Sequence, residues 1–383
     1  MTITSAQGFR AAGVAAGLKS SGGLDVALVV NDGPSFAAAG VFTSNRVKAA
    51  PVLWCEQVLS TGQLQAVVLN SGGANACTGP AGFADTHHTA EHVAEQLGMG
   101  AIDVGVASTG LIGLRLPMPQ LLDGITAAVK ELSTGGGQSA AEAIMTTDSV
   151  PKQAFLSRDG FIVGGMAKGA GMLAPGLATM LVVLTTDAEA DSSVLAATLR
   201  AATAMTFDRV DSDGAMSTND TVLLLASGAS GAAPDPASLS AAVTEVCHEL
   251  AQQLLADAEG STKDISITVE QAASVDDALI VARAIARNNL VKCAFFGADP
   301  NWGRILAAVG TTNAVFEPDE LDVVINGVEV CRAGGIGADR DSCDLTGRTI
   351  AVRVRLHAGE HQATIWTNDL SIAYVHENSA YSS

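Results

Sequence analysis

Short apolar runs recur along the whole chain and limit its fold more than any other feature. Each run is rich in Val, Ile and Leu and is shorter than an ordinary helix, which is typical of strands. They predict strands at 24–30, 64–69, 180–185, 221–226 and 348–356. In the last run, Ile350, Val352 and Val354 alternate with exposed-type residues, which indicates a half-buried strand in an antiparallel sheet.

Segments with helical periodicity lie between these runs. The expected helices cover 118–132, 191–207, 238–255 and 276–288. Strands interspersed with helices predict a mixed α/β (α+β) protein, in which mixed β-sheets are layered with helices. A chain of 383 residues is long for one simple core, so we expect two lobes.

The charge balance limits the partners of this protein. The 40 Asp and Glu residues outnumber the 21 Lys and Arg residues, which gives a formal net charge of -19. A field of that sign repels phosphate backbones and anionic lipids, so we expect no nucleic acid and no membrane as partner. We find neither a signal sequence nor a run of about 18 apolar residues, and we therefore expect a cytoplasmic protein.

Three further patterns have mainly structural interpretations. The six cysteines show no CxxC spacing and predict buried free thiols. His88 and His92 belong to an H-x-x-E-H sequence, an inverted zinc-peptidase motif, but a solvated helix face is the simpler origin and we expect no metal. Residues 211–220 faintly resemble a calcium loop, but the glycine is misplaced and the closing glutamate is missing, so we expect a turn.

The most informative segment is 164–187. Its small, glycine-rich first part predicts a flexible approach that ends abruptly at an apolar strand, and Thr179 lies at that junction. A threonine at the start of a strand usually has a structural role and no catalytic one. If the Ala178–Thr179 bond were cut, however, Thr179 would gain an α-amine with a pKa of about 7.7–8 beside its own hydroxyl. Nucleophile and base would then belong to one residue.

The residues from Lys168 to Leu181 resemble the self-processing segment of the ornithine acetyltransferases, the bifunctional arginine-biosynthesis proteins. The resemblance continues along nearly the whole chain, in the stretches 108–113, 146–148, 257–260, 296–304 and 374–383. It implies a ping-pong glutamate N-acetyltransferase, in which Thr179 takes the acetyl group of N-acetyl-L-ornithine and passes it to L-glutamate. No cofactor is implied, and acetyl-CoA stays open as an alternative acetyl donor.

The resemblance also implies autocatalytic cleavage between Ala178 and Thr179. The products would be an α chain, 1–178, and a β chain, 179–383, assembled as an α2β2 heterotetramer. These are cleavage units and need not be structural domains.

Site residues are implied in the same way. Thr109 and Gly110 match the family's oxyanion hole, where a hydroxyl and a backbone N–H would stabilise the charge on the acetyl oxygen. The positions that match the family's substrate-binding residues are Thr146, Lys168, Thr179, Glu259, Asn378 and Ser383. The family often has Asn or Ser where this chain has Gly176, and often Thr where it has Ser383.

Three alternatives remain open from the residues alone. An N-terminal-nucleophile hydrolase would use the same Thr179 with water as the acceptor. In a binding or scaffold protein, Thr179 would be structural and the chain would stay uncut. A zinc peptidase would need stoichiometric metal at His88 and His92.

Overall fold

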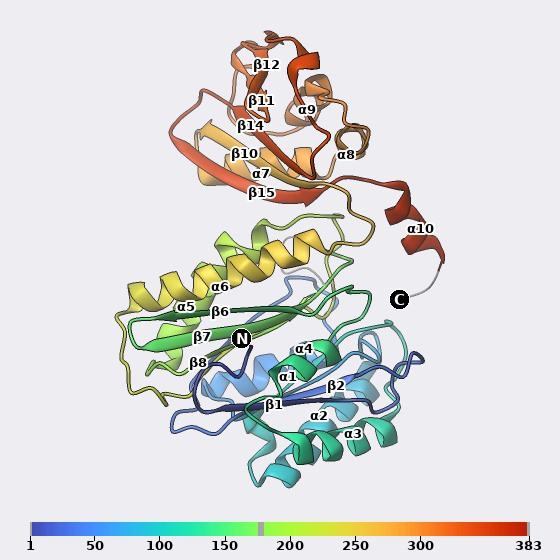
Figure 1. Ribbon diagram of the computed structural model, residues 1–383, viewed down its shortest axis with the longest axis vertical. Coiled ribbons are helices and arrows are strands. Elements are labelled where there is room, and N and C mark those ends of the chain that lie inside the picture. The colour runs from blue at the N-terminus through green and yellow to red at the C-terminus, as the bar shows by residue number, and fades with distance from the viewer. Residues whose placement is uncertain (1, 175–179, 381–383) are drawn as a thin grey trace.

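The computed structural model describes residues 2–174 and 180–380, and these form two lobes (Figure 1). A sandwich lobe, which ends near Ala258, contains two sheets and two of the large apolar clusters. A C-terminal lobe, residues 264–369, has one sheet and its own apolar cluster. The expected mixed α/β architecture with two lobes is confirmed.

Two sheets lie face to face in the sandwich lobe. The first has the order β1 (Phe9–Val14), β2 (Val26–Asn31), β4 (Ala66–Asn70) and β5 (Val104–Ser108). The second has the order β3 (Ala38–Phe42), β9 (Thr221–Ala226), β8 (Leu181–Thr186), β7 (Phe161–Lys168) and β6 (Lys152–Arg158). Both are mixed, because β4–β5 and β8–β9 are parallel pairs and the other neighbours are antiparallel.

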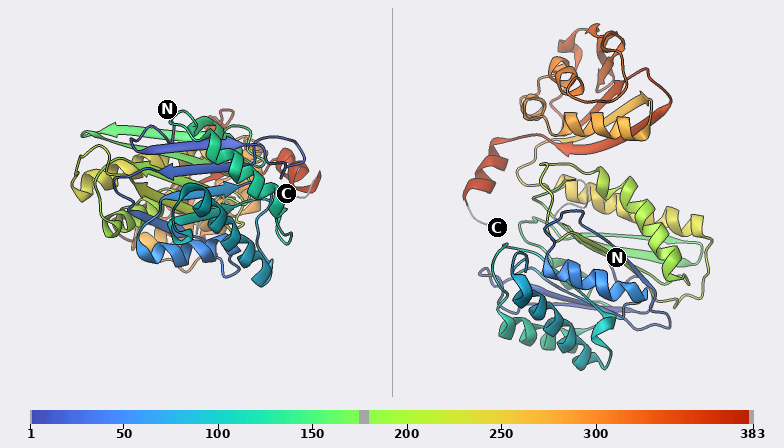
Figure 2. Two further views of the ribbon diagram at one scale, coloured as in Figure 1. Left: turned by 90° about the horizontal axis from the view of Figure 1, so that it is seen from below. Right: turned by 180° about the vertical axis from the view of Figure 1, so that it is seen from behind.

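Helices cover the outer faces of this sandwich (Figures 1 and 2). On the first sheet the outer helices are α2 (Gly79–Leu97) and α3 (Met118–Glu131). Helix α1 (Ala50–Val58) contacts β5 and β3, one strand of each sheet, and α4 (Gly137–Ala143) packs on β1 and β2 and also contacts β7 of the second sheet. The second sheet carries α5 (Ser192–Met205) and α6 (Pro236–Ala256).

The continuous apolar sequence of β8 follows from this layering. Leu181 and Val183 join the cluster shared with the first sheet, while Val182 and Leu184 join the cluster under the helices. A strand that is buried on both faces has no reason to alternate polar and apolar residues.

The C-terminal lobe has a six-stranded sheet. Its order is β13 (Gly335–Ile336), β12 (Val328–Arg332), β11 (Asp322–Ile325), β14 (Thr349–Arg355), β10 (Asp264–Ala272) and β15 (His361–Asn368). The helices of this lobe are α7 (Val275–Ala286), α8 (Asn289–Phe296) and α9 (Trp302–Val309). Single 3-10 turns complete the described chain at Leu59–Thr61, Ala101–Asp103, Phe207–Arg209, Pro318–Glu320 and Arg340–Ser342.

The alternation predicted for 348–356 is confirmed, but the sheet type is not. Ile350, Val352 and Val354 are fully buried in β14, as expected. The strand is antiparallel to β11 and parallel to β10, so the expectation of an antiparallel sheet was wrong. The chain between β10 and β14 is long and includes three helices, which gives it room for the crossover that a parallel pair needs.

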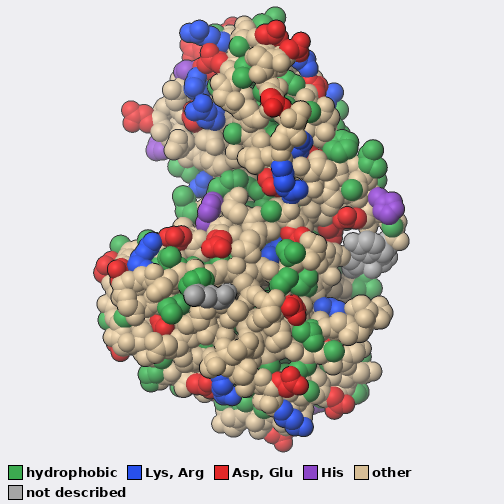
Figure 3. Space-filling model, viewed as in Figure 1, with side chains coloured by type: hydrophobic (Ala, Val, Ile, Leu, Met, Phe, Trp, Pro, Cys, Tyr) green, Lys and Arg blue, Asp and Glu red, His purple; other side chains and the backbone are tan. Residues whose placement is uncertain are grey.

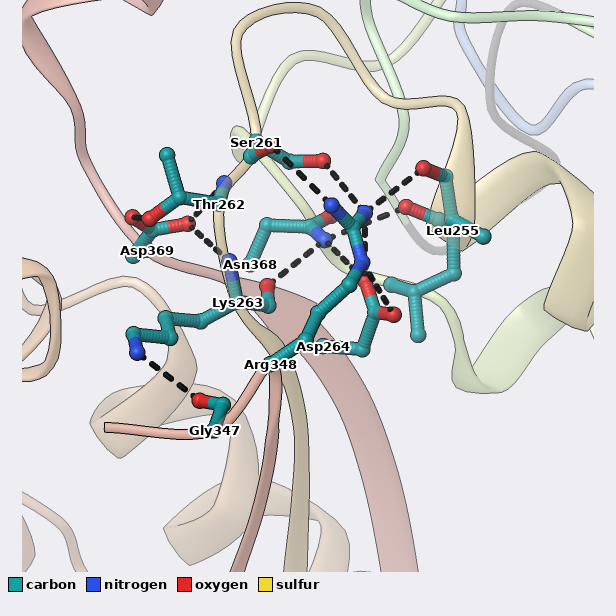
Figure 4. Close-up of polar contacts among 10 residues, drawn as sticks. Leu255, Ser261, Thr262, Lys263, Asp264, Gly347, Arg348, Asn368 and Asp369 are labelled. Atoms are coloured by element: carbon teal, nitrogen blue, oxygen red, sulfur yellow. Dashed lines mark hydrogen bonds and ion pairs between the residues drawn. The ribbon is translucent and has the colours of Figure 1, made fainter. Parts of the chain in front are cut away.

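After β15 the chain returns toward the sandwich lobe as α10 (Ile372–Ala380), which both Figure 1 and the rear view in Figure 2 show leaving the C-terminal lobe. Polar contacts fix the start of this return (Figure 4). Asn368 donates to the carbonyls of Leu255 and Lys263, and Asp369 accepts from the N–H groups of Thr262 and Lys263. The end of α6, the inter-lobe segment and the start of α10 are therefore held together.

The surface agrees with the acidic composition. Figure 3 shows acidic side chains on both lobes of the viewed face. No helix within residues 2–174 and 180–380 has the length and hydropathy to cross a bilayer. All six cysteines are free; four are buried, as predicted, whereas Cys77 and Cys293 are exposed.

Candidate active site

One edge of the sandwich lobe gathers residues from both sheets. The parallel strands β4 and β5 end there together, with Asn70 opposite Ser108 in the register, and the Asn70 amide donates to Ser108 Oγ at 2.6 Å. Thr109 and Gly110 follow β5 directly. In the facing sheet, Lys168 is the last residue of β7 and pairs with Leu181, the first residue of β8.

Gly110 has a conformation that only glycine readily adopts. Its φ is 127°, and a Cβ there would meet Gly73 N at 2.8 Å. Its N–H donates to no acceptor in the described part of the chain. A free backbone N–H beside the Thr109 hydroxyl is the donor pair that an oxyanion hole requires.

Lys168 is fully buried, although a lysine that precedes a glycine-rich segment would ordinarily lie on the surface. Its Nζ donates to Thr109 Oγ1 at 3.1 Å, which leaves the threonine proton free to donate elsewhere. Burial lowers the pKa of Lys168, and the charge of Asp148 opposes this shift. The ammonium group therefore lies where it polarises the Thr109 hydroxyl.

Asp148 lies between the two buried lysines at this edge, Lys152 and Lys168. Its carboxylate accepts from the N–H groups of Thr146 and Gly169 and from Lys152 Nζ, at 2.6 to 2.9 Å. Burial alone would raise the pKa of Asp148, but the charges of Lys168 and Lys152 outweigh it and lower the pKa to about 2. Asp148 is thus a buried carboxylate that stabilises two buried ammonium groups.

Two further residues of the site, Glu259 and Asn378, do not come from the two sheets: Glu259 follows α6 and Asn378 lies on α10. Glu259 lies in the segment after α6, where its N–H donates to Ala170 O at 3.0 Å, and its Oε2 accepts from the Asn378 amide at 3.0 Å. Gly171 lets this carboxylate approach, because a Cβ there would lie 2.7 Å from Glu259 Oε2. The tail helix α10 therefore reaches the site, and Asn378 lies near its C-terminal end.

These residues surround one cavity of about 80 Å³. Its lining contains six of the residues expected from sequence, Thr109, Gly110, Thr146, Lys168, Glu259 and Asn378, together with Thr147, Gly171 and Met172. A neighbouring cavity of about 340 Å³ shares Glu259 and is lined by Asp213, Lys292 and Tyr374 among others. Six positions from five separate parts of the sequence thus meet at one place.

Ala178 and Thr179, with Gly176, lie outside the described residues, as does Ser383. The chain on either side of 175–179 ends at this edge of the sandwich. Met180 N donates to Asp220 Oδ1 at 3.1 Å, and Met180 O accepts from Thr221 N at 3.1 Å.

The approach to this point differs from the expected flexible segment. Ala170, Leu173 and Ala174 are buried, and Leu173 O accepts from Ser212 N at 2.6 Å. Met172 has a φ of 55°, which is unusual for a side chain of its size. The small residues here allow close packing instead of freedom, so the flexible interpretation was wrong as far as Ala174.

Asp148 is the residue whose role the sequence did not indicate. It stands in the Thr146–Asp148 stretch that resembles the family, but nothing in the sequence says that it faces Lys152 and Lys168. Asp148 and Lys152 are four residues apart, but the segment between them is not helical, so their spacing gave no signal of the contact.

Of the two motifs with structural interpretations, the histidine motif lies away from this site, whereas the segment 211–220 borders it. His88 and His92 are on α2, where His92 Nε2 contacts Thr126 Oγ1 at 2.9 Å. No group of three or more potential metal ligands occurs within the described ranges. In the segment 211–220, Asp211 pairs with Arg287, Asp213 lines the larger cavity and Asp220 binds Met180.

A family model matches residues 10–383 of this chain, and that model describes the ArgJ family. The chain belongs to the ArgJ family. It is 65% identical over 383 residues to the arginine biosynthesis bifunctional protein ArgJ of Streptomyces avermitilis, covering all of both chains. It is 61% identical over 390 residues to the Mycobacterium tuberculosis ArgJ, covering all of this chain and 96% of that protein.

Among solved structures, one match is the ornithine acetyltransferase from Mycobacterium tuberculosis, complexed with ornithine. It is 64% identical and covers 47% of this chain and 96% of that chain, with a TM-score of 0.45. As an ArgJ protein, this chain is an acetyltransferase of arginine biosynthesis, as the sequence resemblance predicted.

Proposed function

We propose that this protein transfers the acetyl group of N-acetyl-L-ornithine to L-glutamate through an acetyl ester on Thr179. The observation that carries this proposal is the cavity in which Thr109, Gly110, Lys168, Glu259 and Asn378 converge. The 65% identity to an ArgJ protein over the full length of the chain supports acetyl transfer as the class of reaction.

The chain would first cut itself. The Thr179 hydroxyl attacks the carbonyl carbon of Ala178, the Ala178–Thr179 peptide bond breaks, and the α-amine of Thr179 is freed. Water then hydrolyses the ester. The buried approach through Ala174 and the fixed Met180 support this step, because both ends of the segment are held while the bond between them reacts.

Acetyl transfer then follows in two half-reactions. Thr179 Oγ1 attacks the acetyl carbon, its proton passes through the α-amine to the leaving nitrogen, and ornithine departs. The glutamate amine attacks the resulting ester and restores the hydroxyl. In both half-reactions the acetyl oxygen carries developing charge, which the Gly110 N–H and the Thr109 hydroxyl would stabilise.

The remaining residues bind the substrates. Lys168 offers a buried ammonium group for a substrate carboxylate, and Glu259 offers a carboxylate oxygen for a substrate ammonium group. Thr146, Asn378 and Ser383 complete the proposed binding set. Because α10 brings Asn378 to the cavity, the C-terminal tail is part of this proposal.

The cleavage units 1–178 and 179–383 would remain one body. β7 and β8 are paired over six positions in the same sheet, although the proposed cut lies between them. We propose the α2β2 assembly on the resemblance alone.

The test measures N-acetylornithine consumption with and without L-glutamate. We expect consumption to depend on glutamate and to yield equal amounts of ornithine and N-acetylglutamate. Equal rates without glutamate would instead identify a hydrolase.

The relatives' description as bifunctional favours a second activity, N-acetylglutamate synthesis from acetyl-CoA. Labelled acetyl-CoA and glutamate, without N-acetylornithine, would then give labelled N-acetylglutamate. Failure to form it would leave the enzyme with the first activity alone.

A further inference from the structure

The cavity lined by Thr109 and Gly110 is too small for a whole substrate. Its volume is about 80 Å³, whereas sites for small molecules usually measure about 300–1,000 Å³. The neighbouring cavity of about 340 Å³ reaches that range, and Glu259 lines both cavities. A substrate whose acetyl group enters the small cavity therefore has room for its side chain in the larger one, beyond Glu259. We call the larger one the side-chain cavity.

The side-chain cavity lies between the two lobes. Its lining comes from residues 212–214 of the sandwich lobe, from the end of α7 and from α8 in the C-terminal lobe, and from residues 369–374, which lead into α10. The chain after α6 packs directly on this last segment, because a Cβ at Gly260 would lie 2.2 Å from Tyr374 N. Elements of both lobes thus fix the position of the lining.

Two residues of this lining have hydrogen-bonding groups to spare, and these are of opposite kind. Arg287 donates through Nε to Asp211 Oδ2 at 2.7 Å, and its two Nη groups have no partner in the part of the chain that the structure describes. Glu259 accepts from Asn378 at Oε2, and its Oε1 has no partner among the same residues. The cavity therefore offers positively charged donors as well as a negatively charged acceptor.

The other charged groups of the lining are already bonded. Asp213 and Asp369 accept backbone N–H groups, and the three protons of Lys292 go to two carbonyls and one hydroxyl. Lys292 adds buried positive charge to the cavity but has no donor left. Within the described lining, Arg287 is therefore the cation that can bind a ligand directly.

The proposed reaction needs both signs of charge in one place. In a ping-pong transfer, N-acetylornithine and then glutamate present the same backbone atoms to one reacting group, so their side chains extend into the same space. The ornithine side chain ends in an ammonium group, and the glutamate side chain, of similar length, ends in a carboxylate. Glu259 attracts the first but repels the second, which needs a cation within reach.

We infer that Arg287 binds the side-chain carboxylate of glutamate in the second half-reaction. The two Nη groups of a guanidinium match the two oxygens of a carboxylate. The bond from Nε to the buried Asp211 fixes the guanidinium, while about half of the Arg287 side chain stays exposed and open to an incoming substrate. The inference rests on the proposed function and adds to it a residue that selects the acceptor.

The test is Arg287→Gln in the full chain, with kcat/KM measured for each substrate. In a ping-pong reaction, each kcat/KM reports only the half-reaction of its own substrate. Because a charge-assisted hydrogen bond is lost, we expect kcat/KM for glutamate to fall about 10- to 100-fold. The value for N-acetylornithine should stay unchanged. An unchanged value for glutamate, or an equal loss for both substrates, would overturn the inference.

Labelled ornithine serves as the matched acceptor. Acetyl exchange from N-acetylornithine to labelled ornithine uses the same acetylated enzyme as transfer to glutamate, but its side chain is cationic. We expect Arg287→Gln to leave this exchange unchanged and to reduce the preference for glutamate over glutamine. Equal losses of transfer to ornithine and to glutamate would show general damage to the site and overturn the inference.

Arg332→Gln is the control for the lost charge. Arg332 lies on β12, is mostly exposed and is 3.9 Å from Glu329, so both kcat/KM values should stay unchanged. A selective loss for glutamate equal to that of Arg287→Gln would show a general effect of charge and overturn the inference.

Arg287→Lys covers the case in which Arg287→Gln does not fold. Lysine keeps a positive charge beside Asp211 but lacks the planar pair of donors. We expect kcat/KM for glutamate to fall several-fold and that for N-acetylornithine to stay unchanged, and no selective loss would overturn the inference. The unmodified enzyme is assayed first: if it shows no glutamate-dependent transfer, the proposed function fails, whatever Arg287 does.

Discussion

The two lobes place their buried charges differently. In the C-terminal lobe, charged residues such as Arg353 and Glu270 lie on the open face of the sheet, over an apolar core, and the buried Lys292 donates to Ser212 O in the sandwich-lobe part of the sequence. In the sandwich lobe, Lys152 and Lys168 are buried at the edge where two sheets meet, with Asp148 between them. Burying charges is costly, so a protein that retains such a cluster usually uses it.

This comparison of the two lobes indicates which substitutions should change catalysis and which should change only stability. Both lobes contain strands, helices and threonines at strand starts, but the sandwich edge combines a cavity lined by the family-matched residues, a Gly110 N–H without an acceptor in the described chain, and the buried Lys168 and Asp148. Changes at this edge should therefore affect catalysis strongly, and equivalent changes on the open face of the C-terminal sheet should affect it little.

The largest expected effect comes from Thr179→Ala. Without the hydroxyl, neither the peptide bond nor the acetyl group can be attacked, so we expect an uncut chain and no detectable transfer. A denaturing gel and the glutamate-dependent assay measure both. Thr349→Ala, at the exposed first residue of β14, is the control and should behave like the unmodified protein. A cut and active Thr179→Ala protein would refute the mechanism.

The next effect comes from Thr109→Val, which keeps the shape of the side chain but removes the hydroxyl. Loss of one oxyanion donor typically lowers kcat by about 10²–10³. Steady-state kinetics on cut enzyme would measure this, with a smaller change expected in KM. A kcat within threefold of the original would exclude Thr109 from the oxyanion hole.

Asp148→Asn should chiefly lower stability. Removing one partner of a buried charge cluster costs about 3–5 kcal/mol, and because Lys152 keeps its ion pair with Asp257 at 2.6 Å we expect the lower end of that range. Urea unfolding would measure the free energy of unfolding. A loss below 1 kcal/mol would mean that the cluster does not depend on Asp148.

The pH dependence of that loss follows from the lowered pKa of Asp148. Its folded-state pKa of about 2 lies below the unfolded value of about 3.9, so the carboxylate stabilises the folded chain fully above the unfolded value. This contribution declines as the pH falls from about 4 toward 2. The difference in unfolding free energy between Asp148→Asn and the unmodified protein should narrow over that range, and a constant difference would contradict the assignment.

The smallest effect is expected in the C-terminal lobe. Arg353 lies 3.9 Å from Glu270 and its side chain is about half exposed, a kind of pair that contributes about 0.2–1 kcal/mol. Arg353→Ala should therefore change stability slightly and acetyl transfer not at all. A large loss of acetyl-transfer activity would show that catalysis also depends on the surface of the C-terminal lobe.

Much of the fold could be predicted from the sequence. The strand at 221–226 and the helix at 118–132 match β9 and α3 within one residue, because the first is a short continuous apolar run and the second follows the helical period. The parallel pairing of β10 and β14 could not be predicted, because the pattern of one strand does not identify its neighbour.

The site was predictable only through resemblance. Lysine and glutamate are usually surface residues, and nothing local to Lys168 or Glu259 shows that Lys168 is buried against Thr109. Asp148 and Asp220 act through contacts between segments far apart in the sequence, and the residue pattern has no signal for such contacts.

The central claim is that a threonine freed by self-cleavage performs the transfer. Intact-mass measurement of active, purified enzyme tests it most directly. We predict two polypeptides, one ending at Ala178 and one beginning at Thr179, whose masses sum to that of the uncut chain plus one water. A single uncut polypeptide in fully active enzyme would contradict the account.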